Sequence, residues 1–128
     1  MRTAISKEAE NMRVLLIEPD AYPKAVSIDG GLKSMQDLVG GLIQAIYPFE
    51  DPVAIICNEE GKLEGLEPNR ALRHPETRQV YDIICGSFFI CGLGEDDFIS
   101  LSPELMKKYE QEFHYPELFI PCCRDIPS

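Results

Sequence analysis

The apolar residues of this chain are gathered in short runs that glycine and proline interrupt, and this pattern limits the folds open to it. The longest runs are residues 53–57 and the interrupted stretch 83–93. Both are typical of buried strands and are far shorter than the ~20 apolar residues that a helix needs to cross a bilayer. The 128 residues, 45% of them hydrophobic, are enough for one core and leave no room for a second domain. We therefore expect a single domain without a membrane span.

Several segments have the residue pattern of strands. Residues 14–17 are apolar and end before Pro19, and residues 25–29 alternate between apolar and polar side chains, which favours a hairpin. Gly86 lies inside the most apolar run and indicates a bulge or a close backbone approach. Residues 53–58 are nearly all apolar, which is typical of a central strand covered on both faces. The predicted strand segments are residues 14–17, 25–29, 42–47, 53–58 and 81–93.

Two further segments have the apolar spacing of amphipathic helices. Residues 32–39 are followed by Gly40 and Gly41, which we interpret as a C-cap and a tight turn, because a phosphate-binding loop would precede a helix. The second helix begins after Ser102, a good N-cap, with proline at its first position. Residues 63–72 are predicted to be compact and irregular. These segments predict an α+β fold: a single domain with a mostly antiparallel or mixed sheet of about five or six strands and two helices packed on it.

The chain is strongly acidic, with 22 acidic and 12 basic residues and a net charge of -10. A protein of this charge repels a phosphate backbone unless its basic groups are gathered on one face. The basic cluster formed by Arg70, Arg73 and Arg78 is interleaved with Glu67 and Glu76. We therefore expect a solvated acidic surface and no direct binding of duplex nucleic acid.

The five cysteines do not have the spacing of a disulfide framework or of a zinc site. Cys57, Cys85 and Cys91 lie in apolar runs, where cysteine commonly serves as a small hydrophobic residue. Zinc ligands usually come in pairs with short spacers, which are missing here. The adjacent Cys122 and Cys123 are either redox-sensitive, if exposed, or simply two thiols in a tail. We predict neither a metal nor a cofactor.

The N-terminal residues 1–11 are polar and contain no apolar core of a secretory signal. We expect them to form a flexible leader to a domain that comprises residues 12–128. We also expect the protein to stay in the cytoplasm and away from membranes.

An ordered set of motifs resembles one family. The motifs are Met-Arg-Val-Leu-Leu-Ile-Glu-Pro at residues 12–19, Asn-Glu-Glu-Gly-Lys-Leu at 58–63, Gly-Leu-Glu-Pro-Asn-Arg-Ala-Leu at 65–72, Asp-Ile-Ile-Cys-Gly-Ser-Phe-Phe-Ile at 82–90 and Ser-Pro-Glu at 102–104. From Met12 to Ile120 the chain resembles the DUF3846 family of small domains from bacteria, phages and mobile elements. Members usually have a Leu-Pro step before the Asn-Arg pair, whereas here Glu67 separates Leu66 from Pro68. The resemblance implies such an origin and no established activity.

The polar residues that most need an explanation are Asn58, Asn69, Arg70 and Asp82. Asparagine both donates and accepts hydrogen bonds, and arginine presents a planar fork, so this set can orient a small anionic ligand such as a nucleotide. The structural alternative is that Asn58 and Asn69 satisfy turns and that Arg70 pairs with Asp82.

No motif points to catalysis. His74 and His114 have no neighbour that marks a nucleophile or a base, and the carboxylate runs lack the spacing of a calcium loop. The first hypothesis is therefore a non-enzymatic binding domain of a phage or mobile element that acts on a host protein through its acidic surface. The second is a binder of a small anionic ligand, with a pocket formed by Asn58, Asn69 and Arg70. The third, metal-dependent hydrolysis, has no motif to support it.

Overall fold

The computed structural model describes residues 11–119, which form an α+β single domain. The main sheet has the strand order β2-β1-β7-β4-β3, with β8 paired to the end of β7, and β5 and β6 form a second sheet. Each neighbouring pair of strands is antiparallel. The elements are β1 (Asn11–Ile17), β2 (Lys24–Asp29), α2 (Leu32–Val39), β3 (Ile43–Ile46), β4 (Val53–Asn58), β5 (Pro68–Arg73), β6 (Val80–Cys85), β7 (Phe88–Leu93), β8 (Phe98–Ile99) and α3 (Pro103–Glu112).

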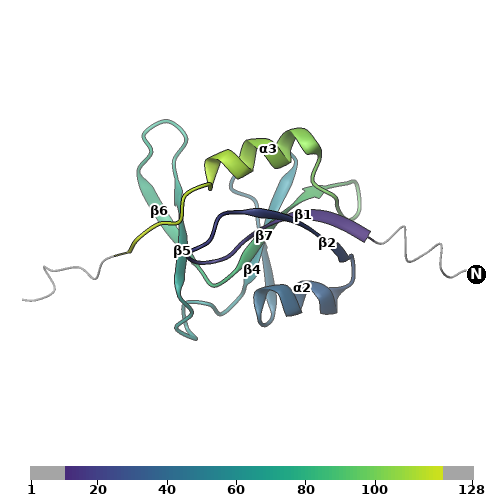
Figure 1. Cartoon of the computed structure of the whole chain (residues 1–128), viewed down its shortest axis with the longest axis horizontal. Coiled ribbons are helices and arrows are strands. Elements are labelled where there is room, and N and C mark those ends of the chain that lie inside the picture. Colours follow the sequence, from purple (N-terminus) through teal and green to yellow (C-terminus); the bar gives the residue numbers. More distant parts are fainter. Residues whose placement is uncertain (1–10, 120–128) are drawn as a thin grey trace, which may run out of the picture.

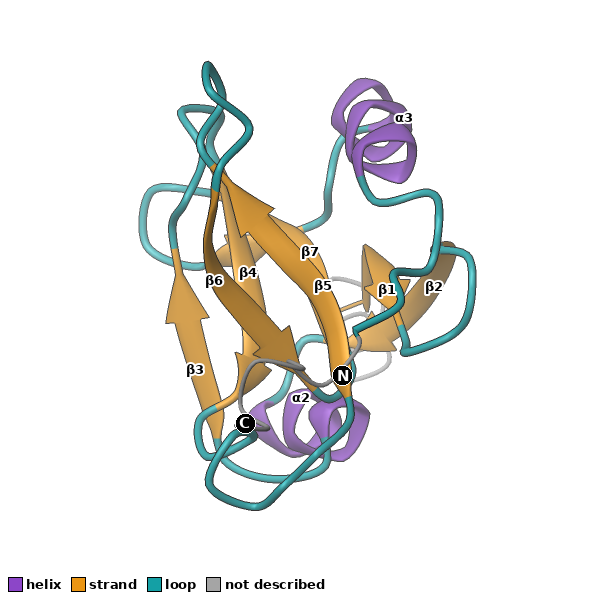
Figure 2. Cartoon of the chain, turned by 90° about the vertical axis from the view of Figure 1, so that its left-hand side faces the viewer, coloured by secondary structure: helices purple, strands orange, loops and turns teal. Residues whose placement is uncertain are grey.

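The two faces of the main sheet are covered by different helices, as Figures 1 and 2 show. Successive side chains of a strand point to opposite faces. Ile55 accordingly packs in the core beneath α3 with Tyr109, whereas Ile56 packs in the core beneath α2 with Met35. Every residue of β4 is buried, which confirms that this strand is central and covered on both faces.

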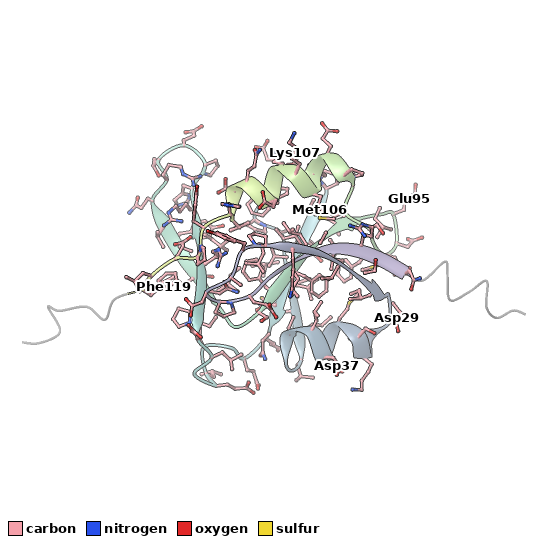
Figure 3. All side chains as sticks on the ribbon, viewed as in Figure 1. Asp29, Asp37, Glu95, Met106, Lys107 and Phe119 are labelled. Carbon is pink, nitrogen blue, oxygen red and sulfur yellow. The ribbon has the colours of Figure 1, made fainter. Side chains whose placement is uncertain are left out.

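Both predicted helices are confirmed, together with the predicted end of α2 and the predicted start of α3. Gly40 follows α2 in the left-handed conformation with φ 81°, and its N–H donates to the carbonyl of Gln36 at 2.8 Å. The hydroxyl of Ser102 accepts from the N–H of Leu105 at 3.2 Å at the start of α3. Figure 3 shows Lys107 extending from α3 away from the sheet. Neither helix of the described part is long and apolar enough to cross a membrane.

Two local predictions need correction. Residues 63–72 are not irregular throughout, because β5 begins at Pro68 and pairs with β6. Residues 81–93 are not one strand, because Gly86, with φ 88°, turns the chain from β6 into β7, which belongs to the other sheet. A β-carbon on Gly86 would lie 2.7 Å from Cδ1 of Leu66, so the close approach predicted at this glycine is present.

The second sheet lies at the left-hand end of the molecule in Figure 1, beside the loop that joins β1 to β2. The core beneath α3 includes Leu72 from β5 and Ile84 from β6, so this sheet shares the main core. Of the predicted leader, Asn11 begins β1, and residues 1–10 lie outside the described residues, as do Cys122 and Cys123.

Candidate functional site

The four predicted site residues lie in two different places. Asn69 and Arg70 point into the fold from β5 and are 1% and 0% exposed. The side-chain amide of Asn69 donates to the carbonyls of Ile17 and Gly86, each at 2.9 Å. Its oxygen accepts from Nη1 of Arg70 at 2.9 Å. Asn69 therefore joins β1, β5 and the turn before β7.

Arg70 uses its guanidinium to join two segments that are remote in the chain. Nε donates to the carbonyl of Phe113 at 3.0 Å, and Nη2 donates to the carbonyl of Ala21 at 2.7 Å. Burial lowers the pKa of this group, and the carboxylates of Glu117 and Asp20 act in the opposite direction. The donors of Arg70 are thus directed at two remote backbone carbonyls and at the side-chain oxygen of Asn69.

Asn58 and Asp82 meet Lys62 around a small cavity of about 180 Å³. The amide oxygen of Asn58 accepts from the N–H of Glu60 at 2.7 Å, so Asn58 does cap its own turn. Asp82 accepts from Nζ of Lys62 at 2.5 Å and from the N–H of Ile83 at 2.8 Å. The bond from Lys62 holds the pKa of Asp82 below its usual value. The ion-pair partner of Asp82 is therefore Lys62 and not Arg70, the partner that the structural alternative predicts.

The cysteine thiols at this cavity are poor nucleophiles. Cys57 and Cys85 both line it. Burial raises the pKa of Cys57 to about 11, and burial also raises the pKa of Cys85. Because the thiolate is the reactive form, neither residue has the environment of a catalytic cysteine.

The chain beyond Asn58 forms a compact acidic loop, residues 59–67. Its four glutamates are exposed, and Leu63 at its tip is 87% exposed. The N–H of Glu64 donates to the carbonyl of Glu60 at 2.8 Å, and that of Leu66 donates to the carbonyl of Gly61 at 2.9 Å. The glutamates are Glu59, Glu60, Glu64 and Glu67.

Gly61 seats the acidic loop directly against β6. A β-carbon at this position would lie 2.6 Å from the carbonyl oxygen of Cys85. At the other end of the loop, the carbonyl of Glu67 accepts from the N–H of Gly86 at 2.8 Å. The loop is therefore held at both ends by the second sheet and the turn that follows it.

An exposed aromatic cluster, formed by Tyr22, His114 and Tyr115, lies beside the two backbone carbonyls that Arg70 binds. The rings of Tyr22 and His114 are stacked with centroids 4.6 Å apart. Nδ1 of His114 lies 2.6 Å from Oε2 of Glu110. Sequence reasoning missed this cluster, because its members are remote in the chain and no local motif marks them.

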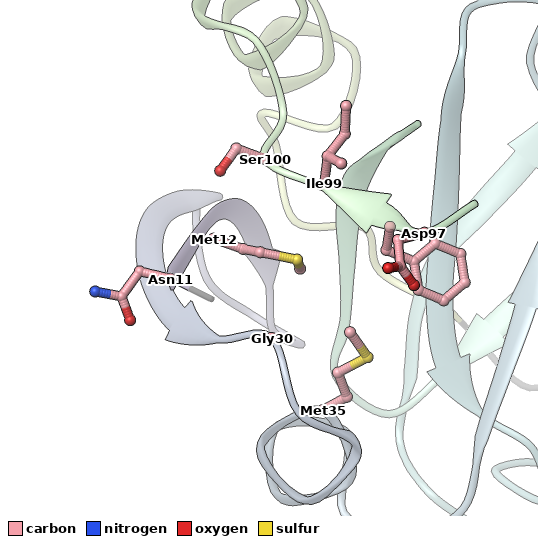
Figure 4. Close-up of a pocket in the computed structure, with 8 residues that line it drawn as sticks. Asn11, Met12, Gly30, Met35, Asp97, Ile99 and Ser100 are labelled. Atoms are coloured by element: carbon pink, nitrogen blue, oxygen red, sulfur yellow. The ribbon is translucent and has the colours of Figure 1, made fainter. Parts of the chain in front are cut away.

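Two of the described cavities that are larger than the Asn58 cavity lie elsewhere in the fold. One, of about 490 Å³, lies between the start of β1, α2 and β8 and has a mixed lining of apolar and polar residues (Figure 4). The apolar residues are Met12, Met35, Phe98 and Ile99, and the polar ones are Asn11, Asp97 and Ser100. The other, of about 410 Å³, lies beside α3. Its cations are each paired with a carboxylate: Arg73 with Glu117, Arg78 with Glu112 and Lys108 with Asp51. These pairs leave little positive charge for an anion.

Among residues 11–119, the structure brings together no group of three or more His, Cys, Asp or Glu side chains that is suited to a metal ion.

Comparison with known proteins gives one relationship. A family model described as a domain of unknown function, DUF3846, matches residues 12–114. No match was found among curated proteins or among solved structures. Because the family model covers well over half of the sequence, the chain belongs to the DUF3846 family.

Proposed function

We propose that this chain is a non-enzymatic interaction domain that binds a basic partner protein through the acidic loop. The observation that carries the proposal is Leu63, which is 87% exposed at the tip of an ordered loop that bears four exposed glutamates. An apolar side chain ringed by charged residues matches the arrangement of an apolar interface core with a polar rim.

The order of the acidic loop favours binding. Asn58 caps its first turn, Gly61 packs against Cys85, and backbone hydrogen bonds close it from within. A loop that already has its bound shape loses little conformational entropy when a partner docks. The loop is therefore suited to present Leu63 to an apolar pocket.

The charge around the loop specifies the chemistry of the partner. The cation within the loop, Lys62, is engaged by Asp82, so the four glutamates dominate the local field. With a net charge of -10, the whole chain attracts basic surfaces and speeds their association. The partner would carry lysine or arginine around an apolar pocket. Given the bacterial, phage or mobile-element origin that the family resemblance implies, it would be a host protein met in the cytoplasm.

The alternative of a small anionic ligand has weaker support. Arg70 is fully buried, and its donors are used by Phe113, Ala21 and Asn69. Lys62, the cation of the Asn58 cavity, is paired with Asp82. An incoming anion would have to break these bonds before it gained any of its own.

Selection from a random displayed peptide library tests the proposal even though the partner is unidentified. We expect the wild-type chain to enrich peptides with several lysines or arginines next to an apolar residue. Binding should weaken with salt, because exposed charges are screened. Leu63→Ser should abolish the enrichment. Leu32→Ser, at a position on α2 that is 58% exposed, serves as the matched control and should leave it unchanged.

A second pair of variants tests the charge. E59Q/E60Q/E64Q should strongly weaken the binding of the selected peptides. The control E95Q/D96N/D97N removes the same charge from the exposed run between β7 and β8 and should weaken peptide binding much less. Equal effects of the two triple variants, or selected peptides that bind Leu63→Ser as tightly as the wild type, would disprove a role for the acidic loop.

A further inference from the structure

The aromatic cluster has a defined geometry on the surface. Tyr22 and His114 are nearly parallel, with 14° between their ring planes. Tyr115 stands across both, at 73° to Tyr22 and 86° to His114. Tyr22 is 59% exposed and Tyr115 73% exposed. Single exposed aromatic residues are common, but three rings in mutual contact form a shaped apolar surface.

Buried hydrogen bonds fix the backbone of this cluster from behind. Arg70 binds the carbonyl of Ala21, directly before Tyr22, and the carbonyl of Phe113, directly before His114. The guanidinium therefore sets the separation of the two segments that carry the stacked rings. Glu110 holds the His114 ring from the side at 2.6 Å. A cluster fixed in this way loses little entropy when a ligand stacks on it.

Carboxylates connect the cluster to the acidic loop. The carboxyl group of Asp20, two residues before Tyr22, interacts with that of Glu67 at the end of the loop and raises the pKa of Glu67. Of the cations nearby in the sequence, Lys24 lies 3.6 Å from Glu18 and Arg73 binds Glu117 at 3.0 Å. Arg70 lies buried behind the cluster, with its donors on Phe113, Asn69 and Ala21. Asp20 and Glu67 thus link the aromatic cluster to the acidic loop.

We propose that the aromatic cluster binds an arginine side chain of the basic partner, stacked on the free face of Tyr22 and beside the edge of Tyr115. A guanidinium is planar and weakly hydrated, so it stacks on tyrosine faces better than an ammonium group does. The carboxyl groups of Asp20 and Glu67 supply acceptors for its N–H donors. A nucleobase would also stack, but its phosphates would be repelled by the same carboxylates. This inference rests on the proposed function and names the side chain that the partner must carry.

An NMR titration with defined peptides tests the inference. The probes are three short peptides in which serine alternates with arginine, with lysine or with uncharged citrulline. We expect the arginine peptide to shift the ring resonances of Tyr22 and Tyr115 and to bind roughly two- to fivefold tighter than the lysine peptide, the difference expected for one exposed cation–π contact. The citrulline peptide should not bind.

Variants of exposed tyrosines provide the matched comparison. Tyr22→Leu should remove the preference for arginine over lysine, and Tyr22→Phe should retain it. Tyr47, which has the same 59% exposure as Tyr22 and follows β3 at the edge of the main sheet, is the control, and Tyr47→Leu should behave as the wild type.

The outcomes separate this inference from the proposed function. If the arginine and lysine peptides bind equally and Tyr22→Leu changes neither, the arginine site is wrong, while weaker binding in E59Q/E60Q/E64Q would still support the acidic loop. If neither basic peptide binds at low salt, the arginine site is wrong, while the acidic loop is judged separately by the library selection, whose peptides can supply the apolar residue that Leu63 requires. If a single-stranded oligonucleotide shifts the Tyr22 ring and the arginine peptide does not, the cluster is a base-stacking surface and the inference is overturned.

Discussion

The guanidinium of Arg70 donates a hydrogen bond from Nε to the backbone carbonyl of Phe113, 43 residues later in the chain. This bond and the one to Ala21 join the end of α3 and the loop between β1 and β2 to the second sheet. Arg70→Met keeps the length of the side chain and removes all of its donors. We expect it to lower the free energy of unfolding by about 2–4 kcal/mol, because the buried carbonyl of Phe113 and the partly buried carbonyl of Ala21 lose these donors.

Urea denaturation measures the effect of Arg70→Met against a matched surface variant. Arg78 binds Glu112 at 3.3 Å, with a side chain that is 54% exposed. Exposed pairs of this kind contribute less than about 1 kcal/mol, so Arg78→Met should be close to the wild type. Similar midpoints for the two variants would show that the hydrogen bonds of Arg70 do not stabilise the fold.

Because Gly61 packs against the carbonyl of Cys85, we expect position 61 not to tolerate a side chain. A β-carbon there would lie 2.6 Å from that oxygen, so either the acidic loop or β6 must shift. We expect Gly61→Ala to cost about 1–3 kcal/mol, the range for overpacked sites. Gly65, with φ 74° and no atom within 4 Å of the position a β-carbon would take, is the comparison. Because asparagine tolerates the left-handed region, Gly65→Asn should cost less in thermal denaturation, and the reverse order would contradict the close packing of the loop on β6.

Local patterns predict the helices and most strands of this protein, but they do not predict its long-range polar contacts. The ends of α2 and α3 follow from Gly40 and Ser102, whose preferences act within a few residues. By contrast, β5 begins with proline and asparagine, which disfavour strands, and it depends on pairing with β6.

The same difference between predictable local turns and unpredictable long-range contacts holds at the candidate site. The turn at Asn58 was predictable, because an asparagine at a strand end commonly caps the following residues. The long-range partners of Arg70 were not predictable, because they are backbone carbonyls, and every residue has one. The stack of Tyr22 on His114 was missed because it depends on how Arg70 brings two remote segments together.

Asp51 predicts an acid-sensitive contribution to stability. Hydrogen bonds from Lys108 and Tyr109, each at 2.6 Å, hold the pKa of this carboxyl group below its ordinary value. A depressed folded-state pKa stabilises the protein above the unfolded-state pKa, and this stability is lost as the pH falls through the folded-state value. The difference in unfolding free energy between the wild type and Asp51→Asn should be constant near neutral pH and should shrink below about pH 4. A difference that persists unchanged in acid would mean that the charge of Asp51 does not contribute to the stability of the fold.

The three described cysteines predict an ordered pattern of thiol reactivity. Cys57 and Cys91 are buried, and burial raises the pKa of Cys57 to about 11 and that of Cys91 to about 12. Cys85 is partly exposed. Near neutral pH the buried thiols therefore have very little thiolate, and a reagent reaches them only when the fold opens. In a variant with Cys122→Ser and Cys123→Ser, maleimide followed by peptide mass mapping should label Cys85 first. Cys57 and Cys91 should react only at the rate of opening and should become fast in urea. Labelling of Cys91 as quickly as Cys85 in the folded protein would contradict the burial of Cys91 in the core beneath α2.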